Sequence, residues 1–458
     1  MSLSMLQIKL EDVDTAEKRS RYTVTIIGCG QTGVLHAYLF ADAGFKVICA
    51  DPDQRALSLL GKGKTPFLNN EIKSKLKTCL KSGTLEVTSN IKNAVSNSNI
   101  VIITTPVKID EKKRVDYSNI RSTCKQVGLG LRQGTLIVIA STVGLGFTEG
   151  VIKEVLEDAS GFKAGTDFGL AYSPVQISDT ESSQMFANKR LVAGIEKSSL
   201  NSASIILGAV TKGGIKKAAN VKTVEFAELF VTAQKIVNIA LANELAIICE
   251  SAGVDFLETL KLLSDDAHGM FLAPKIAEKS ILDEAHILFE DAESMNMKLR
   301  IPLVAEKVNE ETIRHVVNLT KNALREAGKT LRRARIAILG ITEAPNMKSQ
   351  PKAMTKVLAE MLEAKGAKVN FYDPNFSEEE LAEIGYPLKR SLSDAMEGAD
   401  CIVISTGHDQ FKHLNLKKLK VMMRMPAAIV DLEGVAEPNE IREEGLIYRG
   451  LGRGAIPE

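Results

Sequence analysis

The stretch from Val24 to Asp51 constrains the fold more than any other part of this chain. A short apolar run rich in β-branched residues leads directly into Gly28-Cys-Gly-Gln-Thr-Gly33, and a helical pattern then ends at Gly44. A second apolar strand follows and ends in Asp51. Strand, glycine-rich turn, helix, second strand and terminal acid stand in the order that a dinucleotide-binding βαβ unit requires. A glycine turn that binds nothing would not need all five parts, so we expect a dinucleotide fold.

Each glycine of this turn has its own expected role. Gly28 allows the tight turn after the strand, Gly30 lets a pyrophosphate approach the backbone, and Gly33 lets the helix pack closely on the strands. The first turn of the helix offers unpaired N–H groups to the phosphates. The Asp51 carboxylate would accept hydrogen bonds from the adenosine ribose and repel the 2′-phosphate of NADP, which predicts NAD as the cofactor.

Length and composition set the class of protein. At 458 residues, of which 45% are apolar, the chain should form two or three domains with large cores. A net charge of +1 without a long basic run argues against nucleic acid as a partner. We find no secretory leader and no apolar run of about 18 residues, so we expect a cytoplasmic protein without a membrane segment. The six cysteines form no CxxC pair and the histidines show no ligand spacing, so we expect no metal.

Two further apolar runs, at 99–104 and 135–140, are typical of parallel strands buried on both faces. They lead into Thr105-Pro106 and Ser141-Thr142-Val143-Gly144. Parallel strands present ligands at their carboxyl ends, so we expect both loops to border the cofactor. The residues that we assign to the cofactor site are Gly28, Gly30, Gln31, Thr32, Gly33, Asp51, Arg55, Thr105, Pro106 and Thr142.

The pattern becomes helical from 221 to 263, where apolar residues recur at three- and four-residue steps, and helices continue to 327. The α/β pattern restarts at Arg335, and the segment 366–375 (GAKVNFYDPN) repeats the pattern of 44–53 (GFKVICADPD). We therefore predict an α/β protein with two Rossmann-like parallel-sheet domains joined by a long central helix and a helical middle domain. The expected parts are a mobile tail at 1–21, an NAD-binding domain at 22–215, a central dimerisation domain at 216–330 and a C-terminal domain at 331–458.

This layout resembles the UDP-glucose/GDP-mannose dehydrogenase family, the nucleotide-sugar 6-dehydrogenases, over nearly all of the chain. The resemblance implies NAD in the N-terminal domain, a UDP-sugar substrate at the domain interface, a homodimer or larger oligomer built on the central helix, and a role in polysaccharide biosynthesis. The matching segments are Gly28–Gly33, Thr104–Pro106, Ser141–Val143, Asp167–Pro174, Asn243–Glu250, Tyr372–Pro374 and Tyr448–Gly452.

The chain departs from this family where the family does its chemistry. Oxidation of a primary alcohol to a carboxylate takes two hydride transfers, and the family holds the aldehyde on a cysteine, usually within G-x-G-G-x-C-x-x-K-D. The best match here is 282–291, in which only Asp291 survives. Ile287 takes the place of the cysteine and Glu290 that of the lysine, and no cysteine lies between Cys249 and Cys401.

Other positions of the family pattern differ as well. Val175 stands for a glutamate after Ser-Pro, Glu228 and Thr232 stand for the lysine and asparagine of the central helix, and Ala344 stands for a lysine in G-x-A-F-K. One loss could be a variant mechanism. This many losses predict that the usual four-electron chemistry is absent.

No catalytic residue can be assigned from the sequence, and Asp291 is a weak candidate only. We expect Asp291 to be a solvated helix residue and His286 an ordinary surface histidine. Three functions remain open. They are an NAD-dependent nucleotide-sugar dehydrogenase with an atypical site, an inactive NAD-binding paralogue that acts as a partner or regulator, and a one-step oxidoreductase acting on another hydroxyl. Lys212, Lys216, Lys217 and Lys222 are expected to form a solvated loop rather than a phosphate site.

Overall fold

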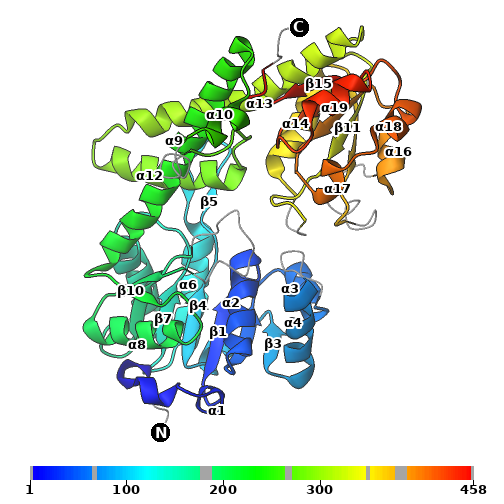
Figure 1. Cartoon of the computed structure of the whole chain (residues 1–458). Helices are drawn as coiled ribbons and strands as arrows, with labels where there is room; N and C mark the ends of the chain where they lie inside the picture. The colour runs from blue at the N-terminus through cyan, green and yellow to red at the C-terminus, as the bar shows by residue number, and fades with distance from the viewer. Residues whose placement is uncertain are drawn as a thin grey trace. The chain divides into compact units, whose positions relative to one another are not determined.

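The structure is a computed structural model that describes residues 4–63, 70–175, 188–263, 271–346, 351–376 and 389–454. It divides into two compact units, of which unit 1 comprises 1–231 and 286–298, and unit 2 comprises 232–285 and 299–458. The division falls inside two helices, α9 (Val221–Ala252) and α12 (Lys279–Ser294). The helical region that the sequence predicts at 216–330 thus has residues in both units, and its helices α9, α12 and α13 are labelled in Figure 1.

Unit 1 is built on an eight-stranded sheet in the order β10-β9-β8-β7-β4-β1-β2-β3. Neighbouring strands are parallel except β8 and β9. The order reverses at β1, so the carboxyl ends of β1 and β4 form the switch point where open α/β sheets bind ligands. The strands are β1 Thr23–Ile27, β2 Lys46–Ala50, β3 Leu85–Thr88, β4 Ile100–Ile103, β7 Leu136–Ile139, β8 Gly169–Tyr172, β9 Arg190–Gly194 and β10 Ile215–Lys217.

Both faces of this sheet are covered. The side chains of β4 and β7 are all fully buried, and they alternate between two core clusters, with Ile102 in one and Ile103 in the other. This explains why these strands are continuous apolar runs in the sequence. The helices of the unit are α2 Gln31–Asp42, α3 Gln54–Gly61, α4 Asn70–Ser82, α5 Ile91–Ser96, α6 Ser118–Gly130, α7 Lys153–Ser160 and α8 Lys197–Gly208, with a short hairpin of β5 Lys108–Ile109 and β6 Val115–Asp116.

The N-terminal segment differs from the mobile tail predicted for 1–21. Its described residues form η1 (Met5–Gln7), η2 (Leu10–Asp12) and α1 (Ala16–Arg19). The Met5 N–H donates to the Gly134 carbonyl at 2.8 Å, and the Ser202 hydroxyl donates to the Met5 carbonyl at 2.7 Å. Met5, Ile8 and Val13 are buried in the core of unit 1. The many charges of this segment obscure these three apolar anchors, which fix it to the sheet.

Unit 2 contains a five-stranded parallel sheet in the order β12-β11-β13-β14-β15. Its bounds are β11 Arg335–Leu339, β12 Lys368–Tyr372, β13 Cys401–Ile404, β14 Ala428–Asp431 and β15 Ile447–Gly450, with α10 Phe256–Lys261, α13 Arg300–Glu326, α14 Ala353–Ala364, α16 Leu392–Met396, α17 Asp409–Lys412, α18 Leu416–Met422 and α19 Pro438–Glu443. The order repeats that of β2-β1-β4-β7-β8 in unit 1. The predicted fold class, with two Rossmann-like sheets and a helical region between them in the sequence, is confirmed.

Helix α9 is more apolar than we expected from the sequence. It contains an 18-residue window with a mean hydropathy of 1.3, of which 39% is buried, so by length and composition alone it could cross a membrane. One such helix is weak evidence for a membrane segment, because the core helices of soluble proteins have the same properties.

Candidate functional site

The turn after β1 has the geometry that the glycine pattern predicts. Gly28 has a φ of +104°, and its N–H donates to the Ala50 carbonyl at 2.9 Å. A Cβ on Gly28 would lie 2.8 Å from the Thr104 Oγ1. The Thr104 hydroxyl in turn lies 2.9 Å from the Ile27 carbonyl and 3.1 Å from the Gly28 carbonyl. The residue after β4 therefore packs against the turn, a role of Thr104 that the sequence did not reveal.

Gly30 and Gly33 face opposite environments. A Cβ on Gly33 would lie 1.8 Å from the Gly28 carbonyl oxygen, so α2 packs on the turn as closely as a backbone can. A Cβ on Gly30 would meet nothing within 4 Å, and its φ of −71° suits any residue. The open space over Gly30, next to the N–H groups of the first turn of α2, fits a pyrophosphate. Gln31 and Thr32 lie in that first turn.

Asp51 is held in a fixed orientation at the end of β2. Its Oδ2 accepts the Cys29 N–H at 2.6 Å and its Oδ1 accepts the Asp53 N–H at 2.8 Å. The side chain is half-buried, and each carboxylate oxygen keeps a lone pair for a further donor such as a ribose hydroxyl. Arg55 is exposed in the first turn of α3, where its N–H donates to the Asp53 carboxylate at 2.8 Å. The residues around this turn thus fit the dinucleotide.

The loops after β4 and β7 lie at the same carboxyl end of the sheet as the glycine-rich turn. Thr105 is buried and its hydroxyl donates inward to Thr123 at 3.3 Å, whereas Pro106 is exposed and Thr142 is half-buried. The Ser141 hydroxyl donates to the Ile103 carbonyl at 3.3 Å and so ties the second loop to β4. All the predicted cofactor residues lie at the carboxyl ends of the strands of one sheet. Their contact with the cofactor stays a prediction.

Two carboxylates hold the rest of the β7 loop. Glu225 on α9 is fully buried and accepts the N–H groups of Gly146 at 2.6 Å and Thr148 at 3.0 Å. Asp291 on α12 accepts the Leu145 N–H at 2.8 Å. Burial raises the pKa of both carboxyls above their usual values, although these N–H groups oppose the shift. No local signal marks Glu225 in the sequence, because its partners lie 77 and 79 residues away.

Our expectations for α12 need correction. Asp291 is half-buried and hydrogen-bonded, not a solvated helix residue. His286 is only 8% exposed and meets the Phe289 ring edge-on with centroids 5.4 Å apart, so it is not a surface histidine. The acidic residues of the segment indicated a solvated helix. Instead, every side chain from 285 to 289 is buried, so most of the helix surface there faces the protein interior.

Buried side chains occupy the positions at which the sequence comparison above expects the family's cysteine, lysine and asparagine. Ile287 is 2% exposed and lies inside α12, so a regular helix stands where a glycine-rich cysteine segment would be expected. On α9, Glu228 and Thr232 are buried, and the Thr232 hydroxyl donates to Glu284 at 3.2 Å. Among the described residues, no group of three or more His, Cys, Asp and Glu side chains could hold a metal ion.

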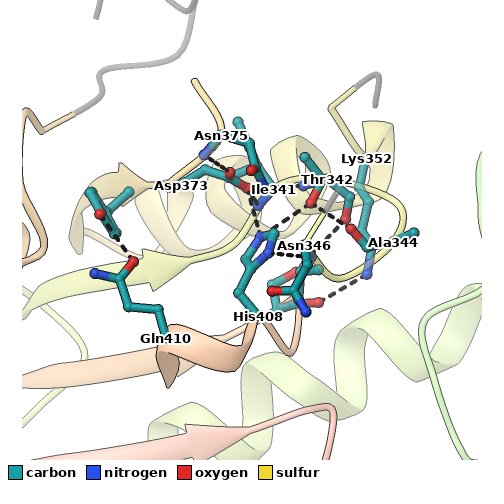
Figure 2. A network of polar contacts seen from close by, with 12 residues as sticks. Ile341, Thr342, Ala344, Asn346, Lys352, Asp373, Asn375, His408 and Gln410 are labelled. Carbon is teal, nitrogen blue, oxygen red and sulfur yellow. Dashed lines mark hydrogen bonds and ion pairs between the residues drawn. The ribbon is translucent and has the colours of Figure 1, made fainter. Parts of the chain in front are cut away.

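Unit 2 has a buried polar network at the carboxyl edge of its sheet (Figure 2). The His408 Nδ1 accepts the Asn346 N–H at 2.8 Å, and its Nε2 lies 3.1 Å from Asp373 Oδ2 and 3.2 Å from Thr342 Oγ1. An accepting Nδ1 assigns the ring proton to Nε2, which donates to Asp373. Burial alone would raise the pKa of Asp373, but the hydrogen bonds that it accepts from His408 and from the Ile341 and Asn375 N–H groups outweigh burial and hold that pKa below its usual value.

Asp373 is the counterpart of Asp51 in the second sheet. Both follow the second strand of a repeat, and the Asp373 Oδ2 accepts the Ile341 N–H at 2.8 Å just as Asp51 accepts that of Cys29. Asp373, however, is 1% exposed and already paired with His408. A nucleotide at this edge must therefore be recognised by groups other than Asp373.

Comparisons with known proteins cover nearly the whole chain. Three models of one family match: the NAD binding domain of the UDP-glucose/GDP-mannose dehydrogenase family at residues 22–207, its central domain at 222–311, and its UDP binding domain at 337–438. The matches fall on the first sheet, the helical region and the second sheet. They support NAD as the cofactor.

Individual relatives are similar at low identity. The UDP-N-acetyl-D-mannosamine dehydrogenase of Pyrococcus horikoshii is 27% identical over 437 residues, covering 94% of this chain and 100% of that protein. The UDP-glucose 6-dehydrogenase of Rhizobium meliloti is 25% identical, covering 94% and 99%. A solved structure of the Pyrococcus horikoshii enzyme superimposes with a TM-score of 0.82 at 26% identity, covering 94% of this chain and 100% of that one.

Proposed function

Because the chain belongs to the UDP-glucose/GDP-mannose dehydrogenase family, we propose that it binds NAD and a nucleotide sugar but does not perform the family's four-electron oxidation. The observation that supports this proposal is Ile287, which is buried within α12 at the position where our comparison with the family pattern places the cysteine. An aldehyde can be held and released as a thioester only by a thiol that reaches it. An isoleucine has no nucleophilic atom.

The surroundings of the missing cysteine support the same conclusion. Glu228 stands where the alignment places a lysine, and a buried carboxylate would repel the oxyanion that a lysine stabilises. Thr232, in place of the asparagine, donates its hydroxyl to Glu284. Two functions are compatible with this arrangement: an NAD-binding partner or regulator without turnover, and an oxidoreductase that removes one hydride from a hydroxyl and stops there.

The residues of unit 1 would hold the cofactor by position and charge. The open face of Gly30 and the first turn of α2 would bind the pyrophosphate, and Asp51 would accept the hydroxyls of the adenosine ribose. NAD, when bound, supplies a hydride acceptor. The protein's own contribution is to fix the cofactor and to exclude a 2′-phosphate by the negative charge of Asp51.

We expect NAD to bind at least about fivefold more tightly than NADP, since a like charge within a few ångströms costs about 1 kcal/mol even in bulk water. Asp51→Asn keeps the acceptor oxygen but removes the charge, so the preference should shrink. Calorimetric titration with both dinucleotides measures it. Asp53→Asn, two residues away, is the matched control and should leave the preference unchanged. Equal affinities of the wild-type protein for NAD and NADP would contradict the assignment of Asp51.

We also propose a homodimer built on α9. Four of the exposed apolar side chains of this helix, Phe226, Phe230, Leu241 and Ile248, are spaced by 4, 11 and 7 residues, which places them on one helical face. Phe230 is 59% exposed and Ile248 is 61% exposed, and the Phe226 and Phe230 rings pack with centroids 4.3 Å apart. An apolar stripe of this length is typical of a subunit contact.

Light scattering at micromolar concentration should give the mass of a dimer for the wild-type protein. Phe230→Lys combined with Ile248→Lys should give a monomer, because two charges would be buried without partners in the interface. Leu262→Lys is the control, since Leu262 is 86% exposed but lies outside α9. A wild-type monomer, or a doubly substituted protein that remains a dimer, would contradict this interface.

A further inference from the structure

The loop from Gly144 to Thr148 follows β7, the second strand from β1 on the side away from β2. Asp51 at the end of β2 marks the adenosine side of the proposed dinucleotide site, and the pyrophosphate would lie at the start of α2. In a sheet of this order the other half of the dinucleotide extends across the ends of β4 and β7. The Gly144–Thr148 loop would therefore border the nicotinamide half of a dinucleotide bound in this way.

Two carboxylates accept hydrogen bonds from three backbone N–H groups of this loop. The Leu145 N–H donates to Asp291 at 2.8 Å, and the N–H groups of Gly146 and Thr148 donate to Glu225 at 2.6 and 3.0 Å. Hydrogen bonds to an ionised acceptor are about twice as strong as neutral ones. Removal of an acceptor would leave a backbone N–H group without a hydrogen-bond partner. The free-energy cost would be a large fraction of the strength of that hydrogen bond.

The loop is also packed against Asp291 from the side. A Cβ on Gly144 would lie 2.7 Å from the Tyr117 Oη and 2.9 Å from the Asp291 Oδ1, so a larger residue here would displace these two side-chain ends. The Tyr117 ring stacks on that of Phe147 with centroids 4.0 Å apart. Both oxygens of Asp291 thus lie against the loop backbone, and one of them is engaged in a backbone hydrogen bond.

We infer that Asp291 is a positioning residue, which together with Glu225 holds the Gly144–Thr148 loop in the shape that accepts the nicotinamide half of the cofactor. Asp291 acts by accepting the Leu145 N–H and does not transfer a proton. This inference rests on the proposed binding of NAD by unit 1. It assigns a role to the one residue of the family's cysteine segment that this chain keeps.

Three substitutions separate positioning from proton transfer. Asp291→Asn keeps an oxygen that can accept the Leu145 N–H but cannot act as an acid or base, so NAD affinity should stay within about threefold of wild type. Asp291→Ala removes the acceptor and should weaken NAD binding about tenfold or more. Asp291→Glu keeps the acid but moves it by one methylene group, so it should bind NAD less well than Asp291→Asn. Glu290→Gln is the control, since Glu290 is exposed and bonds the Val115 N–H outside this loop.

Calorimetric titration with NAD gives the affinities, and amide hydrogen exchange at Leu145 reports the loop itself. Exchange should be slow in the wild type and in Asp291→Asn, and faster in Asp291→Ala. Asp291→Asn as damaging as Asp291→Ala, or Asp291→Glu better than Asp291→Asn, would overturn the inference, as would unchanged affinity in Asp291→Ala. Wild-type protein that does not bind NAD would overturn the proposed function instead, while the exchange rates would still test whether Asp291 holds the loop.

Discussion

Gly30→Ala should weaken NAD binding by at least about fivefold, because overpacking a fitted site by a methyl group costs about 1–3 kcal/mol. The substitution should not lower the melting temperature. The added Cβ meets no protein atom within 4 Å, and the φ of −71° suits alanine. The methyl group would instead fill the space that a pyrophosphate needs at the start of α2.

Two other glycines provide the controls for this experiment. Gly33→Ala would place its Cβ 1.8 Å from the Gly28 carbonyl oxygen and should lower the melting temperature together with NAD binding. Gly208→Ala, at the end of α8, would make an ordinary contact at 3.6 Å and should change neither. Calorimetry and a thermal melt measure the two effects separately. Gly30→Ala with wild-type affinity for NAD would contradict the proposed position of the pyrophosphate.

Restoring the cysteine should not restore the chemistry. In Ile287→Cys the thiol would lie in a helix at a position that is 2% exposed in the wild type, and burial keeps a thiol protonated and unreactive. The lysine and asparagine of the family pattern would still be Glu228 and Thr232. Each missing transition-state donor typically costs on the order of 10² to 10³ in rate. We therefore expect no uronic acid from Ile287→Cys, as measured by mass spectrometry of the products.

Thiol labelling tests the structural basis of that expectation. The thiol introduced by Ile287→Cys should react slowly with an aromatic disulfide reagent, whereas the thiol of Glu293→Cys, exposed on the same helix, should react quickly. The cavity left by the smaller side chain at 287 should lower stability by about 1–2 kcal/mol. Formation of a uronic acid by Ile287→Cys but not by the wild-type protein would show that position 287 is accessible to substrate and would contradict this expectation.

The parts of the fold that the sequence predicted are those encoded by local pattern. The continuous apolar runs of β4 and β7, the glycines after β1 and the repeat of 44–53 at 366–375 are each visible within a single short segment. Met5, Ile8 and Val13 have no such signature, because only their contacts with the sheet reveal them as core residues.

The candidate site shows the same limit. The position of Asp51 follows from the strand that precedes it, but the role of Asp291 depends on Leu145, 146 residues away. Similarly, the sequence indicated that Asp373 ends a strand, but it did not indicate that His408, which follows a different strand, hydrogen-bonds to Asp373. A polar side chain that serves a distant backbone group cannot be told from a solvated one by its neighbours in sequence.

We propose that this chain keeps the cofactor site of its family but does not form the thioester. The most direct test is the stoichiometry of NADH formed per nucleotide sugar consumed, with UDP-glucose and UDP-N-acetylmannosamine as substrates and the products identified by mass. We expect at most one NADH per sugar and no uronic acid from the wild-type protein. Two NADH per sugar with a uronic acid product, at an ordinary enzymatic rate, would contradict the claim.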